Sequence, residues 1–197
     1  MGKEKMRSQS YLKYRWFFTS SGKLVIGGKN AEQNELLVKE ITKSGIDYIV
    51  MHTTNPGSPF TFLVDEGENV TEEDLMEQAV FTGCFSQEWK KQKKTTSIDI
   101  FHSKQITKNK GMKSGTFGVL GKANRRAVEL KLGLEVQEEK LRAVPRPREA
   151  LLWITPGEET RNKAAKEIKK ILKEKNLDFT VEEIERAMPA GGIKIIA

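Results

Sequence analysis

The feature that most constrains the fold is a stretch, 90–131, in which dense positive charge is interleaved with residues that favour β-strands. Twelve Lys and Arg stand there against only two acids, which gives a local charge of +10 in a chain of formal net charge +7. The strand-forming residues between them are Ile98, Ile100, Phe101, Ile106, Phe117, Val119 and Leu120. Such residues pack well in sheets and are scarce in disordered tails. We therefore expect ordered strands joined by a Lys/Gly loop at 108–115.

This charge has a functional interpretation. Like charges on a folded surface repel each other unless a polyanion neutralises them, and contacts to phosphates gain affinity by releasing counterions. We predict nucleic-acid contacts for the cations Lys90, Lys91, Lys93, Lys94, Lys104, Lys108, Lys110, Lys113, Lys122, Arg125 and Arg126. The alternative is an ordinary solvated sheet edge, where lysines discourage pairing with other strands.

The segment before the basic stretch has the opposite charge. Residues 30–89 contain twelve acids and two bases, Lys39 and Lys43. Such a change of sign along the chain predicts a molecule with an acidic and a basic side.

A glycine turn supplies a second candidate anion site. Gly27, Gly28, Lys29 and Asn30 directly precede an expected helix, in which Asn30 is a good N-cap and Gln33 completes a capping box. Amide groups at a helix N-terminus can bind an anion, so we assign Lys29 to nucleic acid and the other three residues to the turn that binds it. The alternative is a plain strand-to-helix turn whose glycines adopt positive φ.

A loop rich in turn-forming residues follows the expected strand at 46–51. It begins at His52 and contains Gly57 and Ser58. His52 at a strand end could contact a ligand or act as an acid or base. Because no other His or Cys lies nearby in the sequence, a structural hydrogen-bonding role is favoured for this loop.

The inventory of metal-binding residues is short. Cys84 is the single cysteine, and His52 and His102 are the only histidines. One cysteine excludes an intramolecular disulfide and a cysteine-rich zinc site, so we expect no metal and no cofactor, with Cys84 in the core. The sequence has neither a long apolar stretch nor a secretory signal, which predicts a cytoplasmic protein without a membrane span.

The remaining pattern predicts an α+β fold with a mixed, mostly antiparallel sheet and packed helices. We expect strand 95–104 to pair with strand 115–120 across the Lys/Gly loop, and a long strand to follow at 128–136. The prolines of 144–148 mark a boundary. Two units are therefore predicted, a main domain at 11–143 and a small β-α-α-β extension at 149–197 that packs on it.

Three segments, in order along the chain, resemble one known family. They are Gly22 with Leu24–Glu35, His52 with Pro56–Pro59, and Gly115–Lys122. All three resemble the NFACT-R domain, over roughly residues 11–136. The resemblance implies an RNA-binding domain of the kind that forms the C-terminal part of factors for ribosome-associated quality control of stalled nascent chains. It implies rRNA or tRNA, the large ribosomal subunit and a separate NFACT-N chain as partners.

The resemblance does not extend to the NFACT-N domain or the helical arms of full-length factors, so the expectation is a stand-alone R domain without tailing activity or catalysis. Two other hypotheses stay open. One is an enzyme acting on a small phosphorylated or nucleotide ligand, with His52, Lys29 and Glu35 in one enclosed pocket. The other is a protein adaptor that docks a ribosomal protein or an NFACT-N chain through the acidic segment or the C-terminal unit.

Overall fold

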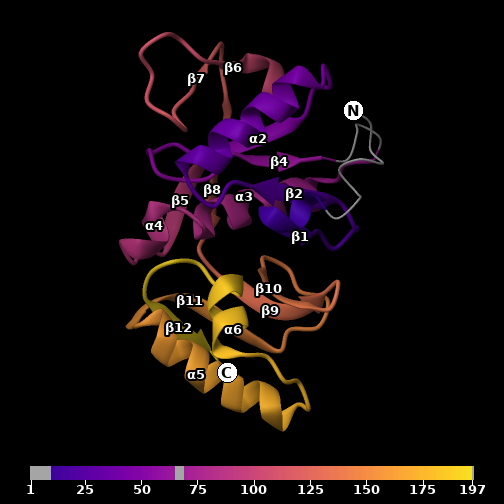
Figure 1. Cartoon of the computed structure of the whole chain (residues 1–197), viewed down its shortest axis with the longest axis vertical. Coiled ribbons are helices and arrows are strands. Elements are labelled where there is room, and N and C mark those ends of the chain that lie inside the picture. The colour runs from indigo at the N-terminus through magenta and orange to yellow at the C-terminus, as the bar shows by residue number, and fades with distance from the viewer. Residues whose placement is uncertain (1–9, 65–68, 197) are drawn as a thin grey trace.

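The computed structural model describes residues 10–64 and 69–196, which form two antiparallel sheets with helices packed on them (Figure 1). The first sheet has the strand order β1-β2-β4-β3-β5-β8. Its strands are β1 (Arg15–Phe18), β2 (Leu24–Gly27), β3 (Ile49–Thr53), β4 (Thr61–Leu63), β5 (Thr95–His102) and β8 (Asn124–Glu129). The predicted α+β class with mostly antiparallel strands is confirmed.

Helices cover both faces of the first sheet. They are α2 (Ala31–Lys43), α3 (Glu72–Cys84) and the short α4 (Gln87–Lys90), with single 3₁₀ turns η1 (Ser10–Lys13) and η2 (Ser103–Gln105). The strand register aligns one row of side chains across the sheet, namely Trp16, Ile26, Phe62, Val50 and Phe101. This row packs with α2, while the alternate positions pack with α3. His52, two residues after Val50, therefore projects from the face that α2 covers.

The predicted N-cap Asn30 is confirmed, but the predicted capping box does not form, because Gln33 Oε1 accepts from the Lys29 N–H instead of the Asn30 N–H. The Asn30 side chain accepts from the Gln33 amide at the start of α2, and Thr71 and Asp74 form a capping box at the start of α3. Asp65, Glu66 and Glu68 of the acidic segment lie outside the described residues, as does the N-terminus before Ser10.

The basic stretch folds differently from its predicted pairing. Strand β5 pairs with β3 on one side and β8 on the other. The expected partner at 115–120 instead contributes the short β7 (Gly118–Val119), which pairs with β6 (Ile106–Thr107) in a separate ribbon. The prediction was wrong because η2 turns the chain out of the sheet directly after β5, so the Lys/Gly loop belongs to a ribbon that projects beside α2 (Figure 1).

The second sheet has the order β10-β9-β11-β12. Its strands are β9 (Leu132–Gln137), β10 (Lys140–Val144), β11 (Leu152–Glu159) and β12 (Ile193–Ile196), and its helices are α5 (Arg161–Glu174) and α6 (Val181–Ala187). The single strand predicted at 128–136 is therefore wrong: β8 and β9 belong to different sheets. The prolines of 144–148 lie between two strands of one sheet. We propose 130–131, where the chain passes from one sheet to the other, as the boundary between the units.

The two sheets share one core. Trp89 of α4 is fully buried in the same cluster as Leu132 and Ile193 of the second sheet, and its Nε1 donates to the Gly192 carbonyl at 3.0 Å. The C-terminal unit therefore packs directly on the first sheet.

Side chains of the second sheet also form hydrogen bonds with backbone groups at the edge of the first sheet. Strand β1 is an edge strand, and the Gln137 amide both accepts from the Phe18 N–H and donates to the Phe18 carbonyl, each at 2.8 Å. An edge strand with unpaired backbone groups invites other chains to pair with it. Gln137 acts in place of a neighbouring strand at this position.

Replacing Gln137 with alanine is expected to lower the free energy of unfolding by about 2 kcal/mol, because two partly buried hydrogen bonds are lost together and their backbone partners stay unpaired. Urea denaturation followed by circular dichroism measures the loss. Glu138→Ala is the control, since residue 138 is exposed. Equal stability of the two variants would contradict the proposed role of the Gln137 amide.

Candidate nucleic-acid interface

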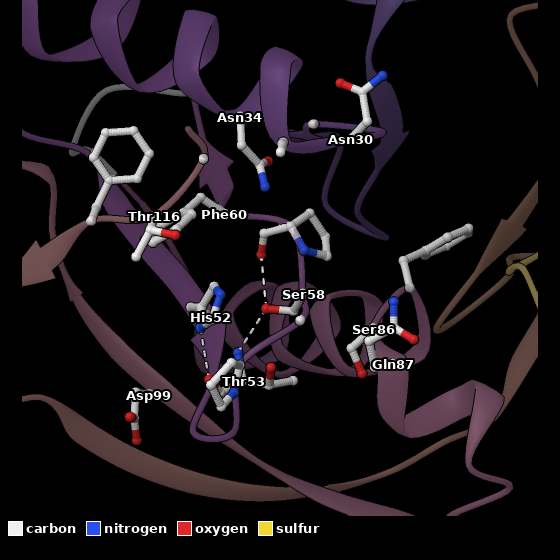
Figure 2. A pocket seen from close by; sticks show the side chains of 18 of the residues that line it. Asn30, Asn34, His52, Thr53, Ser58, Phe60, Ser86, Gln87, Asp99 and Thr116 are labelled. Atoms are coloured by element: carbon white, nitrogen blue, oxygen red, sulfur yellow. Dashed lines mark hydrogen bonds between the residues drawn. The ribbon is translucent and has the colours of Figure 1, made fainter. Parts of the chain in front are cut away.

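A cleft of about 620 Å³ opens beside the start of α2 (Figure 2). Three segments that are far apart in the sequence line it: the glycine turn at 28–31, the histidine loop at 52–60 and segment 114–117, in which the Lys/Gly loop ends. The fold brings them together because Gly115 lies against Ala31 at the start of α2 and its N–H donates to Glu35 of the same helix, while the histidine loop follows β3 on the face of the sheet that α2 covers. Each contains a motif that the sequence had singled out.

Part of the cleft wall is aromatic. The His52 ring lies against Phe60 with centroids 4.6 Å apart, and Phe117 meets Phe60 edge-on at 5.4 Å. Phe101 also lines the cleft and contacts Phe60 at 6.3 Å. Aromatic rings at a positively charged groove are the usual platform on which proteins stack the bases of single-stranded nucleic acids.

His52 is held as a neutral ring. Burial lowers the pKa of His52 below its ordinary value of 6.5, and the Thr53 carbonyl lies 2.7 Å from Nδ1. A carbonyl can only accept, so Nδ1 carries the proton and Nε2 is left as an acceptor. The ring therefore offers the cleft an apolar face and one acceptor at neutral pH.

The depressed pKa of His52 predicts a pH dependence of stability. The unfolded chain takes up the proton at about pH 6.5, whereas folded His52 resists it, so the stability that His52 provides is present above about pH 6.5 and is lost as pH falls through the folded pKa. Urea unfolding measured between about pH 8 and pH 5 should show this slope, and His52→Gln should flatten it. An unchanged slope in the variant would assign the dependence to other groups.

Asn34 is a buried amide that faces the cleft. Its side chain appears there in Figure 2, the residue is 8% exposed, and Oδ1 has no hydrogen-bond partner among the described residues. A Cβ on Gly28 would collide with this oxygen. Neither Gly27 nor Gly28 has a positive φ, so the conformational reason that the alternative gave for these glycines is wrong, while a plain strand-to-helix turn stays an open alternative. Gly28 is needed because of the close approach of Asn34.

The glycine turn uses its own amides. Asn30 Oδ1 accepts from the Gln33 N–H at 2.8 Å, and Gln33 Oε1 accepts from the Lys29 N–H at 3.1 Å. The anion-binding role of Gly27, Gly28 and Asn30 stays a prediction. Lys29, whose side chain is exposed beside the turn, supplies the positive charge there.

The Lys/Gly loop is fastened to α2 by Glu35. Its carboxylate accepts from Lys108 Nζ at 2.8 Å and from the Gly115 N–H at 2.9 Å. Lys108 Nζ also donates to the carbonyls of Lys113 and Thr116, at 2.8 and 2.9 Å, so its three donors are all used. We propose that Lys108 shapes the loop, which leaves Lys110 and Lys113 as its exposed cations.

The histidine loop is also internally fastened. Ser58 Oγ accepts from the Thr53 N–H at 2.9 Å and donates to the Pro59 carbonyl at 3.1 Å. Gly57, with φ +107°, accepts from the Gln87 N–H at 2.7 Å. Gly57 thus holds the loop against α4 and Ser58 braces the loop internally, which accords with a structural role for the loop.

The predicted cations divide into paired and unpaired groups. Lys91 pairs with Glu88 at 2.7 Å, and Arg125 and Arg126 pair with Asp99 and Glu72, each at 2.8 Å. Several cations form no ion pair with any carboxylate of the described residues, namely Lys29, Lys90, Lys93, Lys94, Lys104, Lys110, Lys113 and Lys122. Most of the charge is thus uncompensated, and Lys29 and Lys90 line the cleft itself.

The family model for the NFACT protein RNA binding domain matches residues 13–121, which is more than half of the chain. The chain belongs to the NFACT-R family. This match contains nearly every residue that lines the cleft, with Ala123 and Ala190 outside it.

Curated relatives extend the comparison. The chain is 33% identical over 212 residues to the archaeal Rqc2 homolog aRqcH of Methanocaldococcus jannaschii, covering 98% of this chain and 31% of that protein. It is 28% identical over 116 residues to the human ribosome quality control complex subunit NEMF, covering 57% of this chain and 11% of that protein. The chain thus spans less than a third of the length of these relatives. The C-terminal part of a fibronectin/fibrinogen-binding protein from Streptococcus suis is a solved structure with 18% identity and TM-score 0.48, covering 64% of this chain and 53% of that one.

The NFACT-R cleft bears on the enzyme hypothesis in two ways. It gathers His52 and Lys29 as that hypothesis required, but Glu35 is engaged by Lys108 and Gly115 outside the lining. The carboxylate that does line it, Asp99, is paired with Arg125. In the described part of the chain, no cluster of metal-ligating residues occurs and no helix is long and apolar enough to cross a membrane.

Sequence reasoning missed several residues of the NFACT-R cleft. Asn34, Phe60 and Arg15 all line it, as does Thr116. Asn34 stands in the segment that carries the family resemblance, which was its only signal. In the sequence, Phe60 and Arg15 look like ordinary residues of expected strands. Only the folded structure shows that they line the cleft.

Proposed function

We propose that this chain binds RNA by accepting an unpaired segment in the cleft, while the exposed lysines around it contact the flanking phosphates. The observation that carries the proposal is the convergence of three separated motifs on one cleft with aromatic walls and a cationic rim. Stacking on aromatic rings selects single-stranded over paired bases, and phosphate contacts position the strand without reading its sequence.

The biological setting follows from the relatives. One relative is named as a subunit of the ribosome quality control complex and another as an Rqc2 homolog. We therefore propose that the chain acts in the cytoplasm on rRNA or tRNA at the large ribosomal subunit, without catalysis of its own. A separate NFACT-N chain is a further proposed partner.

Salt dependence of binding to a short single-stranded RNA tests the proposal. The affinity should fall log-linearly with salt, with a slope near −0.7 for each phosphate neutralised on a single strand, and a duplex of the same sequence should bind more weakly. A shallow slope would instead favour a pocket for a small ligand or a protein-docking surface. Equal binding of the duplex would remove the stacking part of the proposal.

A further inference from the structure

A second group of cations lies where the two sheets meet. Arg142 of β10 donates to the Trp16 carbonyl from Nε at 3.0 Å and from Nη2 at 2.7 Å, and its guanidinium lies over the Trp16 ring at 4.5 Å. Arg142 is therefore fixed at the residue that follows Arg15 in β1, close enough for the two positive charges to repel each other. The Arg15 guanidinium lies over Phe85 at 4.7 Å and lines the cleft together with Lys29.

The strand register explains why these cations gather. Arg15 is paired with Gly27 across the β1–β2 hairpin, and Lys29 follows Gly27 by two residues. The second sheet adds Arg142. Arg161 at the start of α5 repels Arg15, and Arg186 in the last turn of α6 repels Lys29, so both lie within electrostatic range of the group. We call Arg15, Lys29, Arg142, Arg161 and Arg186 the seam cluster.

No member of the seam cluster forms an ion pair with a carboxylate of the described residues, although Glu183, whose pKa is lowered by hydrogen bonds from Thr180, is close enough to Arg186 for that charge to lower it further. Burial lowers the pKa of Arg15 to about 10, with repulsion from Arg161 adding to it. Burial likewise lowers the pKa of Arg142 to about 10, helped by Arg15. Desolvation, then repulsion from Arg142, Arg15 and Arg186, lowers the pKa of Lys29. A desolvated charge without a partner is costly in a folded protein, and this cost falls on the partly buried Arg15 and Arg142 rather than on the exposed Lys29 and Arg186.

A structural role alone does not account for the charge. Arg142 satisfies an edge carbonyl of β1, but two residues further along the same edge the neutral amide of Gln137 does this for Phe18. A neutral donor is therefore sufficient for that task. Glu135 stands opposite Arg142 across the β9–β10 pair, but its carboxylate accepts from Gln137 and the Arg148 N–H. A planar guanidinium beside a second one, with neither in an ion pair, is an arrangement that recognises a phosphate oxyanion.

We propose that the seam cluster is a phosphate-binding site, in which Arg15, Lys29 and Arg142 contact the phosphate and Arg161 and Arg186 contribute their field. Arg142, Arg161 and Arg186 lie beyond residue 121, where the family match ends. The site thus gives the C-terminal unit a function, to complete a phosphate site at the end of the cleft. Binding of an RNA phosphate at this site rests on the proposed function, whereas binding of a free phosphate does not.

Inorganic pyrophosphate is the first probe. Its affinity for the whole chain can be measured by calorimetry and by the rise in melting temperature over sodium chloride of matched ionic strength. The wild type should be stabilised beyond the chloride control. Arg142→Gln, which keeps a donor for Trp16 but removes the charge, should bind about tenfold more weakly or worse. Lys29→Gln should also weaken pyrophosphate binding. Because Lys29 is exposed, this variant leaves the core untouched and tests the site even if Arg142→Gln folds poorly.

Lys140→Gln is the matched control, because Lys140 is exposed on the same strand and lies outside the seam cluster. It should bind pyrophosphate as the wild type does. Equal binding by Arg142→Gln, Lys29→Gln and Lys140→Gln would overturn the site, as would a wild type that pyrophosphate stabilises no more than chloride.

RNA strands with different 5′ ends show whether the site takes a terminal or an internal phosphate. If the site takes a terminal phosphate, the wild type prefers a single strand with a 5′-monophosphate over the same strand with a 5′-hydroxyl, and Arg142→Gln loses the preference. If it takes an internal phosphate, both strands bind equally and Arg142→Gln weakens both. RNA affinity that Arg142→Gln leaves unchanged would overturn the inference for RNA. Pyrophosphate binding without any RNA binding would overturn the proposed function and leave the phosphate site standing.

Discussion

Replacing Trp89 with alanine is expected to lower the free energy of unfolding by about 3–5 kcal/mol, the usual cost of deleting a large buried aromatic side chain. Trp89 is fully buried in the core that the two sheets share, and its indole N–H donates to Gly192. The substitution leaves a cavity at the junction and an unpaired carbonyl on the segment that leads into β12.

Urea unfolding followed by circular dichroism measures this effect. Trp153→Ala is the control, because Trp153 lies on β11 and is only partly buried; its loss should be clearly smaller. A cost below about 1 kcal/mol for Trp89→Ala would contradict the account of the shared core. Two separate unfolding transitions in the wild type would contradict it as well.

Replacing Lys93, Lys94, Lys110 and Lys113 together with alanine is expected to weaken RNA binding on the order of a hundredfold or more near 0.1 M salt. These lysines are exposed and form no ion pair with the described carboxylates. If each contacts one phosphate, the salt slope should become shallower by about 0.7 for each lysine removed. Stability should change little, because exposed cations contribute little to folding.

The α5 helix provides a matched control. Lys166, Lys170, Lys173 and Lys175 are also exposed, and replacing them changes the net charge by the same amount. Helix α5 lies at the opposite end of the molecule from the Lys/Gly loop (Figure 1). This control should retain nearly full affinity. Equal losses in the two variants would mean that overall charge, rather than the surface around the cleft, governs binding.

Local features of the fold were predictable from the sequence. Asn30 caps its helix as expected, because an N-cap depends on side chains within four residues. The division of residues 124–137 between two sheets was not predictable in the same way. The chain leaves the first sheet after Glu129 and enters the second at Leu132 without a proline or glycine to mark the step. Only packing against distant residues decides it.

The candidate site shows the same division. Its three motifs were visible because each combines glycines or turn residues with a polar group. Their convergence was not, since it depends on the ribbon folding back onto α2 through Glu35 and Gly115. The seam cluster was hidden for a similar reason. Arg15 and Arg142 are separated by more than a hundred residues and look like ordinary strand cations until β10 is placed against the edge of β1.

Photo-crosslinking of a single-stranded RNA containing 4-thiouridine, followed by mass spectrometry of the attached peptides, tests most directly whether the cleft holds an unpaired segment. We expect crosslinks to concentrate in the histidine loop at 52–60 and in segment 114–117, where His52, Phe60 and Phe117 line the cleft. Crosslinks that fall mainly on α5, or that avoid both loops while the RNA stays bound, would contradict it.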